Sequence, residues 1–485
     1  MSNKKNKVSL NPIMTLMILI VVTIVLSGVL ALFGVGASYD TIKNSTYESN
    51  WVAVESLFNL RGIKYIFQST VSNFAAFTPL SMLIIILIGI GIMDKSGFLK
   101  TTFSLITRKC QKKTLTFVLA LICIILSIGG DLAYVVMIPL SALLFYYGRR
   151  NPLLGIVISF AALTCGTGLS FFKTSIDSSL DALTLESSRI LDSSYTFNYL
   201  GYFIIMVVAI LAIAALITYI AERFSVNELP KYEFKDDKKD FKLAKRDIRG
   251  LIFAGTFGII YLLIFIYNII PGLPLSGNLL DYSQKLYIDK LFNPDSFFSQ
   301  GFVFIVTILF VILGLFYGLG SRSIKNSNDF CDYLTHSLDG IGRTIILILL
   351  SSILVNVFKK SNIGTVITAL IGNLITNCKF TGIPLLVLFF IGTAVATFFL
   401  PNTVNKWTIL SASCVPTLMN VGFSAEFIQV IFRFAEGMTY GLTPIMAYFV
   451  IYLAYMEKYN TSDNPIGVFK ITRVGVDIKI KCVNC

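Results

Sequence analysis

The chain has 485 residues, of which 55% are hydrophobic, 13% are aromatic and only 14% are charged. So few polar residues cannot coat a soluble globule of this size, and the composition therefore predicts an all-α polytopic membrane protein. The net charge of +13 raises nucleic-acid binding as another function, but the sequence contains no basic patch interleaved with aromatic residues, so we set that function aside.

The basic residues are distributed unevenly along the chain. Three lysines lie between residues 4 and 7, six basic residues against one acid fill 94–113, and nine against seven acids fill 222–249. The connections 40–64 and 281–295 are balanced or acidic. Because positive charge marks the cytoplasmic side of a membrane protein, this pattern predicts that both termini are cytoplasmic.

The first half of the chain contains six apolar runs. The first is longer than the core of a signal peptide and lacks a clear small-residue cleavage site, so we interpret it as a retained span. A broken helical entry is expected at 74–79, before the second run. The runs cover residues 12–33, 79–93, 115–128, 132–147, 153–163 and 199–220.

Residues 164–181 mix glycines, hydroxyls and charges between apolar neighbours, which is typical of a re-entrant hairpin. The charged segment 222–249 is expected to be a cytoplasmic loop. It divides the chain into a first transmembrane half, 1–221, and a second, 250–456, and a cytoplasmic tail, 457–485, follows.

The second half repeats this pattern. Spans are predicted at 251–270, 302–319 and 345–358; the last breaks at 359–364 and resumes to 375, and a second re-entrant hairpin follows around 384–420. Interrupted apolar segments in corresponding positions of two halves indicate a secondary transporter of inverted-repeat type, with its site near the membrane midplane.

The stretch 399–444 concentrates polar residues between apolar runs, and such residues mark a binding site or pathway. Arg433 offers a permanently charged fork for a carboxylate, or it pairs with Glu436 on the same helix face. Trp407 stacks on an aromatic ring or anchors at the interface. Three polar side chains follow Pro401: Asn402, Thr403 and Asn405. They either hydrogen-bond the ligand or satisfy the backbone groups that the helix break beside Pro401 leaves unpaired.

Three carboxyl groups are candidates for ion coupling. Asp177 and Glu436 could load and release a proton as their surroundings change, or form permanent salt bridges; Lys173 is a possible partner of Asp177. Asp131, which follows two glycines, binds a cation or caps a half-helix, and capping is the preferred interpretation.

No cofactor or metal is expected. The pair Cys482 and Cys485 has zinc-ligand spacing, but the chain has one histidine, His336, and no second cysteine pair. The catalytic patterns H-E-x-x-H and G-x-S-x-G are absent, and neither a repeated filter loop nor a charge ring is found, so an enzyme and a channel are both disfavoured.

Several motifs agree in order and spacing with one known family. The region from about residue 73 to 448 resembles the p-aminobenzoyl-glutamate transporter family (AbgT family). The motifs are Gly130-Asp131-Leu-Ala-Tyr134-Val-Val-Met-Ile-Pro139-Leu, Ser175-Ile-Asp177, Lys360-Ser361-Asn362-Ile363-Gly364, Lys406-Trp407 with Val415-Pro416, and Arg433 through Thr443-Pro444.

The resemblance implies a homodimer in the cytoplasmic (inner) membrane, with about nine spans and two re-entrant hairpins per protomer. It also implies import of p-aminobenzoyl-glutamate, or proton-driven export of folate-related antimetabolites. The family's hairpin aspartate, tryptophan, proline and arginine fall on Asp177, Trp407, Pro416 and Arg433.

Two family positions differ here. The acidic residue after the arginine is Glu436 instead of Asp, and the serine before the tryptophan is replaced by Val404. The lost hydroxyl leaves open a second function, a sodium-coupled carrier of dicarboxylates or short-chain carboxylates. Structural roles are assigned to Pro416, Pro444 and Gly364.

The sequence thus predicts a membrane transporter, with lipid around it, that binds a small anionic aromatic molecule and uses protons or sodium as the coupling ion. Arg433 would hold the substrate carboxylate, Trp407 its ring, and Asn402 and Asn405 its polar edges, while Asp177 would couple protons.

Overall fold

The computed structural model of the chain describes residues 11–43, 46–169, 174–234, 242–293 and 295–461. Helices dominate these residues, and one two-stranded antiparallel hairpin accompanies them. The elements of the first half are α1 (Pro12–Leu32), β1 (Gly36–Lys43), β2 (Thr46–Ala53), α2 (Leu60–Ala75), α3 (Thr78–Lys95), α4 (Phe98–Lys109), α5 (Lys112–Leu126), η1 (Ser127–Gly129), α6 (Asp131–Tyr147), α7 (Pro152–Gly166), α8 (Ser175–Ser188), α9 (Tyr199–Ile220), η2 (Ala221–Ser225) and α10 (Val226–Glu228).

The second half continues in the same way. Its elements are α11 (Lys245–Ile269), α12 (Tyr287–Phe292), α13 (Phe297–Ser321), α14 (Ser327–His336), α15 (Gly342–Lys360), α16 (Ile363–Asn377), α17 (Ile383–Phe399), α18 (Thr403–Met419), α19 (Ala425–Thr439), η3 (Tyr440–Leu442) and α20 (Phe449–Lys458).

Seven helices of the described residues are long and apolar enough to cross a membrane, which confirms a helical membrane protein. They are Pro12–Leu32, Leu60–Lys95, Lys112–Gly129, Tyr199–Glu228, Lys245–Ile269, Phe297–Ser321 and Gly342–Lys360. Four shorter apolar helices, α6, α7, α16 and α17, lie among them. The prediction of about nine spans and two re-entrant hairpins stays a prediction.

The helix boundaries follow the predicted runs closely where those runs are apolar. α9 covers the same residues, 199–220, as its run, and the break between α2 and α3 falls inside 74–79. α11 begins at Lys245, before its predicted start at 251, because Asp247 accepts a hydrogen bond from the Ala244 backbone N–H at 3.0 Å and stabilises a charged first turn.

Helices α4 and α12 lie inside the predicted connections 94–113 and 281–295, and most of the strand pair β1–β2 and the start of α2 lie inside 40–64. The hairpin pairs Gly36 with Ala53 and Lys43 with Thr46 at its two ends. The hairpin is joined to the second half by the Asn373 side-chain amide, which donates to the Ser38 carbonyl at 2.9 Å. Two residues after β2, the Glu55 N–H donates to the Ser361 carbonyl at 3.0 Å. The hairpin therefore packs on α16 and α18.

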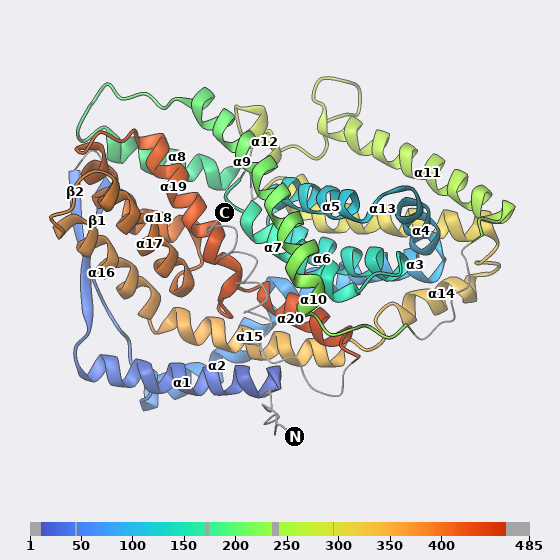
Figure 1. The fold of residues 1–485 in the computed structure, drawn as a ribbon, viewed down its shortest axis with the longest axis horizontal. Coiled ribbons are helices and arrows are strands. Elements are labelled where there is room, and N and C mark those ends of the chain that lie inside the picture. Colours follow the sequence, from blue (N-terminus) through green and yellow to red (C-terminus); the bar gives the residue numbers. More distant parts are fainter. Residues whose placement is uncertain (1–10, 44–45, 170–173, 235–241, 294, 462–485) are drawn as a thin grey trace.

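The two sequence halves interleave in space. α8 lies with α16 to α19 beside the hairpin, whereas α11 and α13 lie with α3 to α7 on the opposite side; α1, α2 and α15 run along one edge (Figure 1). The division into halves at 222–249 stays a prediction about the chain order.

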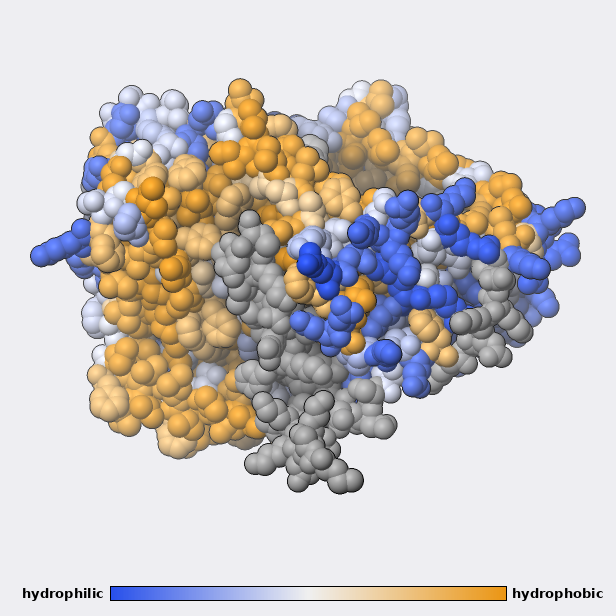
Figure 2. Space-filling model, in the orientation of Figure 1, coloured by the Kyte–Doolittle hydropathy of each residue, from blue (hydrophilic) through white to orange (hydrophobic). Residues whose placement is uncertain are grey.

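The two largest buried apolar clusters of the described residues fill these groups of helices. The larger contains much of α3, α5, α6, α7 and α20. The smaller surrounds Trp407 and draws on α8, α17, α18 and α19. The outer surface over α16 to α19 is apolar, and a hydrophilic surface lies toward α4 and α14 (Figure 2), as expected of a protein with a lipid-facing belt and a basic end.

Candidate functional site

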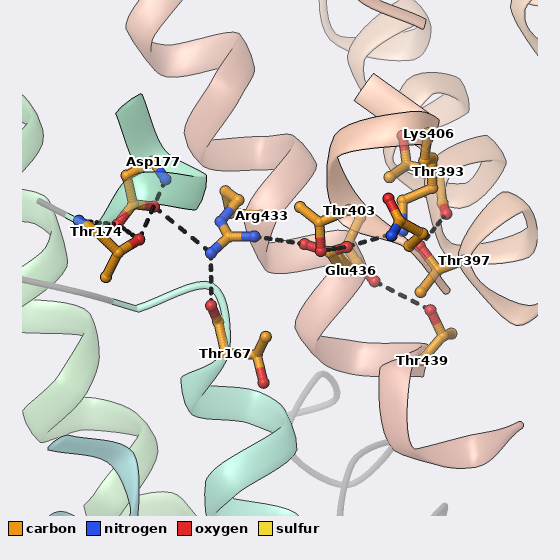
Figure 3. Close-up of polar contacts among 12 residues, drawn as sticks. Thr167, Thr174, Asp177, Thr393, Thr397, Thr403, Lys406, Arg433, Glu436 and Thr439 are labelled. Atoms are coloured by element: carbon orange, nitrogen blue, oxygen red, sulfur yellow. Dashed lines mark hydrogen bonds and ion pairs between the residues drawn. The ribbon is translucent and has the colours of Figure 1, made fainter. Parts of the chain in front are cut away.

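Four buried charged side chains form a chain of alternating sign where α8, α18 and α19 meet (Figure 3). The order is Asp177, Arg433, Glu436 and Lys406, and each exposes at most 5% of its surface. Because isolated charges are costly to bury, the alternation of sign is what allows four of them to share one buried region.

Arg433 lies between the two carboxylates of this row of charges. One terminal nitrogen donates to Glu436 Oε2 at 2.7 Å, and the other donates to the Thr167 carbonyl at 2.5 Å. The second nitrogen also lies 3.6 Å from Asp177 Oδ1, a separation of an ion pair and longer than a hydrogen bond. The Arg433 Nε atom has no hydrogen-bond partner among the described residues.

Glu436 joins two cations and one hydroxyl. Its Oε1 atom accepts from Lys406 Nζ at 2.8 Å and from Thr403 Oγ1 at 2.6 Å, and its Oε2 atom accepts from Arg433. Of the two roles weighed for Arg433 and Glu436, their mutual pairing is therefore present in this structure.

Asp177 is held by the first turn of α8. Its Oδ2 atom accepts from the Thr174 backbone N–H at 3.1 Å and from the Thr174 hydroxyl at 2.7 Å, and the Thr174 hydroxyl accepts from the Asp177 N–H. This capping box leaves Oδ1 free to face Arg433. Lys173, the predicted partner of Asp177, lies outside the described residues.

Small residues bring α19 against the end of α7. A Cβ on Gly168 would lie 2.7 Å from the Arg433 carbonyl oxygen, and a Cβ on Gly437 would lie 3.0 Å from the Cys165 carbonyl oxygen. A side chain at Gly168 would force the two backbones apart, and one at Gly437 would make a tighter contact than most Cβ atoms do. The close approach is what places the Thr167 carbonyl against the Arg433 guanidinium.

Trp407 is fully buried beside the charged chain. Its ring centroid is 4.3 Å from that of Phe432, and its Nε1–H donates to the Thr184 hydroxyl at 2.9 Å. Thr184 donates in turn to the Gln429 amide oxygen at 2.5 Å, and the Gln429 amide donates to Asp181 at 2.8 Å. The indole is thus fixed by hydrogen bonds that run from α18 through α8 to α19.

The other predicted ligand residues lie apart from the buried chain, with one exception. Thr403 is bonded to Glu436, whereas Asn402 and Asn405 are exposed; the Asn402 side chain caps α18 by accepting from the Asn405 N–H at 2.9 Å. Asp131 is exposed in the first turn of α6, where Gly130 is the N-cap and no side chain caps the helix, so the preferred capping interpretation does not describe this structure.

The residues given structural roles lie at packing positions. Pro416 is buried within α18, and Pro444 is half-buried between η3 and α20. A Cβ on Gly364 would collide with the Phe399 carbonyl oxygen, so this glycine lets α16 begin against the end of α17. Their contribution to function stays a prediction.

The comparisons with known proteins decide the family. Residues 4–472 match the model described as the "AbgT putative transporter family". The chain belongs to that family. It is therefore a transporter-family, multi-pass membrane protein, and the resemblance noted in the sequence is confirmed.

Individual relatives are similar along nearly the whole chain. The p-aminobenzoyl-glutamate transport protein of Escherichia coli strain K12 is 23% identical over 468 residues, which cover 96% of this chain and 88% of the relative. The YdaH transporter of Alcanivorax borkumensis is 23% identical with a TM-score of 0.48, covering 98% of this chain and 96% of that one. MtrF of Neisseria gonorrhoeae, from a class of antimetabolite efflux pumps, is 25% identical with a TM-score of 0.48, covering 99% and 94%.

The structure brings together Asp177, Arg433 and Glu436, which were candidate site residues in the sequence. Three further residues of this region, Lys406, Thr184 and Gln429, had no role predicted from the sequence. The spacing of Thr403 and Lys406, three residues apart on one helix, could have placed both on one face, and a lysine on a buried face calls for a partner.

Proposed function

We propose that this AbgT family transporter is a secondary active carrier of p-aminobenzoyl-glutamate or a related aromatic carboxylate of the folate pathway, coupled to protons. The observation that carries the proposal is Arg433, a buried guanidinium between two carboxylates with its Nε–H unused by the described residues. A planar fork of this kind suits a substrate carboxylate.

The weaker of the two carboxylate contacts suggests how a proton is coupled. Asp177 lies 3.6 Å from Arg433, whereas Glu436 makes a hydrogen bond at 2.7 Å. Protonation of Asp177 would remove its charge from the guanidinium, which could then bind the carboxylate of the substrate. In this mechanism the substrate anion and the proton favour each other's binding.

The Trp407 ring is fully buried and packs on Phe432. It would stack on an aromatic substrate only after the helices around it move apart during transport. Asn402 and Asn405, exposed at the start of α18, would contact the polar edges of a ligand approaching from that side. The half-buried Val404 offers no hydroxyl, and the neighbouring Thr403 hydroxyl is already bonded to Glu436. This is why the substrate's identity must be tested directly.

We propose the orientation that the charge pattern predicts, with both termini on the cytoplasmic side of the inner membrane. We also propose that the protein is a homodimer, as its resemblance to the family implies. The loop 222–249 and the tail 457–485 would then lie on the cytoplasmic side.

The test is counterflow of labelled p-aminobenzoyl-glutamate in proteoliposomes under an imposed pH gradient. Asp177→Asn keeps an oxygen that can cap α8 but cannot ionise, so we expect exchange to persist while its response to the gradient is lost. Asp192→Asn, on an exposed aspartate whose carboxylate accepts from the Ser194 backbone N–H and hydroxyl, is the matched control. Full gradient dependence in Asp177→Asn would refute the proton role.

Arg433→Lys tests the carboxylate contact, because lysine keeps the charge but loses the fork. We expect an apparent affinity lower by about tenfold or more, which corresponds to about 1.4 kcal/mol or more. If the wild type ignores this ligand but a dicarboxylate exchanges with sodium dependence, the alternative carrier function replaces the one proposed.

A further inference from the structure

Lys406 is the buried charge that the proposed mechanism does not use. Its side chain exposes 0% of its surface, and its ammonium lies among oxygen atoms. Nζ is 2.8 Å from Glu436 Oε1 and 3.4 Å from the Leu400 carbonyl oxygen. Leu400 directly follows α17 as its C-cap, and Thr403 begins α18, so the ammonium lies at the break between these two helices.

The atoms around this ammonium are of the kind that bind a hard metal cation. A carboxylate, a backbone carbonyl and the Thr403 hydroxyl, which itself contacts the same Glu436 oxygen at 2.6 Å, converge here. A further hydroxyl, that of Thr393 on α17, is fully buried without a hydrogen-bond partner among the described residues. Figure 3 draws it at the Lys406 end of the chain of charges.

The Lys406 ammonium makes the row of four buried charges neutral overall. Asp177 and Glu436 carry two negative charges, and Arg433 alone would neutralise only one of them. Lys406 supplies the second positive charge at hydrogen-bonding distance from Glu436. A carboxylate left unpaired in this buried region would have to take up a proton or a cation from solution.

We propose that Lys406 is a resident cation of the transport site. Its tethered ammonium occupies, against Glu436, the position that an inorganic coupling ion would otherwise fill, and transport by this chain therefore needs no sodium at this position. The inference rests on the proposed function for its transport readout, but its binding readout is independent of any substrate.

The proposal predicts that removing the ammonium creates sodium dependence. Lys406→Ala deletes the charge and opens space among the same oxygen atoms, so a small cation from solution can bind there. Lys406→Arg keeps the charge. The double variant Lys406→Ala/Glu436→Gln removes both charges of the pair and leaves nothing for a cation to neutralise.

The first measurement is the melting temperature of the purified full-length protein at pH 8, in 1 to 150 mM NaCl with choline chloride holding the ionic strength constant. We expect the wild type, Lys406→Arg and the double variant to be insensitive to the exchange of choline for sodium. Lys406→Ala is expected to show a saturable rise of about 1.5 °C for a dissociation constant near 10 mM.

The second measurement is counterflow of labelled p-aminobenzoyl-glutamate at the same salt concentrations. Exchange by the wild type is expected to be independent of sodium, and any exchange by Lys406→Ala is expected to rise along the sodium curve of its melting temperature. Absence of exchange in the wild type refutes the proposed substrate alone, because the melting experiment does not depend on it.

Two results would overturn the resident-cation proposal. One is a saturable sodium response in the wild type, since the site would then accept sodium with Lys406 in place. The other is a folded Lys406→Ala protein whose melting temperature is the same in sodium and in choline. If Lys406→Ala cannot be purified, Lys406→Gln takes its place in the same comparison.

Discussion

The contact between Gly168 and α19 makes a demanding prediction, because it positions Arg433 through the backbone. In Gly168→Ala the new Cβ would lie 2.7 Å from the Arg433 carbonyl oxygen, whereas ordinary contact begins at 3.4 Å. The two segments must therefore separate by about 0.7 Å (3.4 − 2.7), and no side-chain rotation can relieve a clash with backbone.

That separation lowers the free energy of unfolding in two ways. Overpacking of this kind costs about 1–3 kcal/mol. In addition, the hydrogen bond from Arg433 to the Thr167 carbonyl, now 2.5 Å long, would stretch to the edge of hydrogen-bonding range. A bond to a charged group contributes about 1.5–3 kcal/mol, so its partial loss brings the total destabilisation to roughly 2–4 kcal/mol.

The assay is the melting temperature of the purified protein together with counterflow in proteoliposomes. We expect a melting temperature several degrees lower and exchange strongly reduced. The matched control is Gly255→Ala in α11, where a Cβ meets nothing within 4 Å; a helical alanine there should leave stability unchanged or raise it. A Gly168→Ala protein that melts and exchanges like the wild type would refute the close approach of α7 and α19.

Three further substitutions separate structural from functional roles. Asn402→Ala should lower stability by about 1 kcal/mol through loss of the α18 cap while Asn402→Ser restores it, and ligand affinity that falls in both variants would instead show a direct contact. Trp407→Phe should cost about 1 kcal/mol in thermal unfolding by leaving Thr184 without its indole donor, and an unchanged melting temperature would contradict that account. Glu426→Gln should speed amide hydrogen exchange at 189–198, because the carboxylate accepts from the Tyr195 hydroxyl and from a backbone N–H of that loop at 2.6 Å each; protection equal to that of the wild type would count against this tie.

The helices that the sequence predicted well are those whose hydrophobicity is uniform. α1, α6 and α9 are apolar on every side, so the length of the run fixes their limits. α2, α4 and α14 are amphipathic, with a polar face that lowers the average hydrophobicity, and none of them was predicted as a helix. Hydropathy alone cannot separate such helices from loops.

For the candidate site, the sequence identified charges but not their neutral partners. Asp177, Arg433 and Glu436 stand out because ionisable residues are rare among apolar runs. Thr184 and Gln429 do not, since hydroxyls and amides are common within helices, and their bond joins residues that are 245 positions apart. No local pattern indicates a contact over that distance.

The sequence also left two roles open for Asn402, and the structure shows which of them its side chain has here. Its side chain bonds the third residue after it, which is the geometry of a helix cap. The sequence placed this residue beside a proline and predicted either a ligand contact or backbone satisfaction. The second interpretation describes the structure, while the first remains part of the proposed function.

The hairpin β1–β2 offers a way to observe the transport site from outside. It is hydrogen-bonded to α16 and to the turn at Ser361, and it packs on α18, so a spin label on its exposed Tyr47 travels with the helix that carries the buried charges. A second label on the exposed Phe304 of α13 would sit in the other group of helices. The exposed thiols of the described residues, Cys110 and Cys331, and the two tail cysteines, Cys482 and Cys485, would first be replaced. The distance distribution between the labels would then report whether the two groups separate as the carrier turns over.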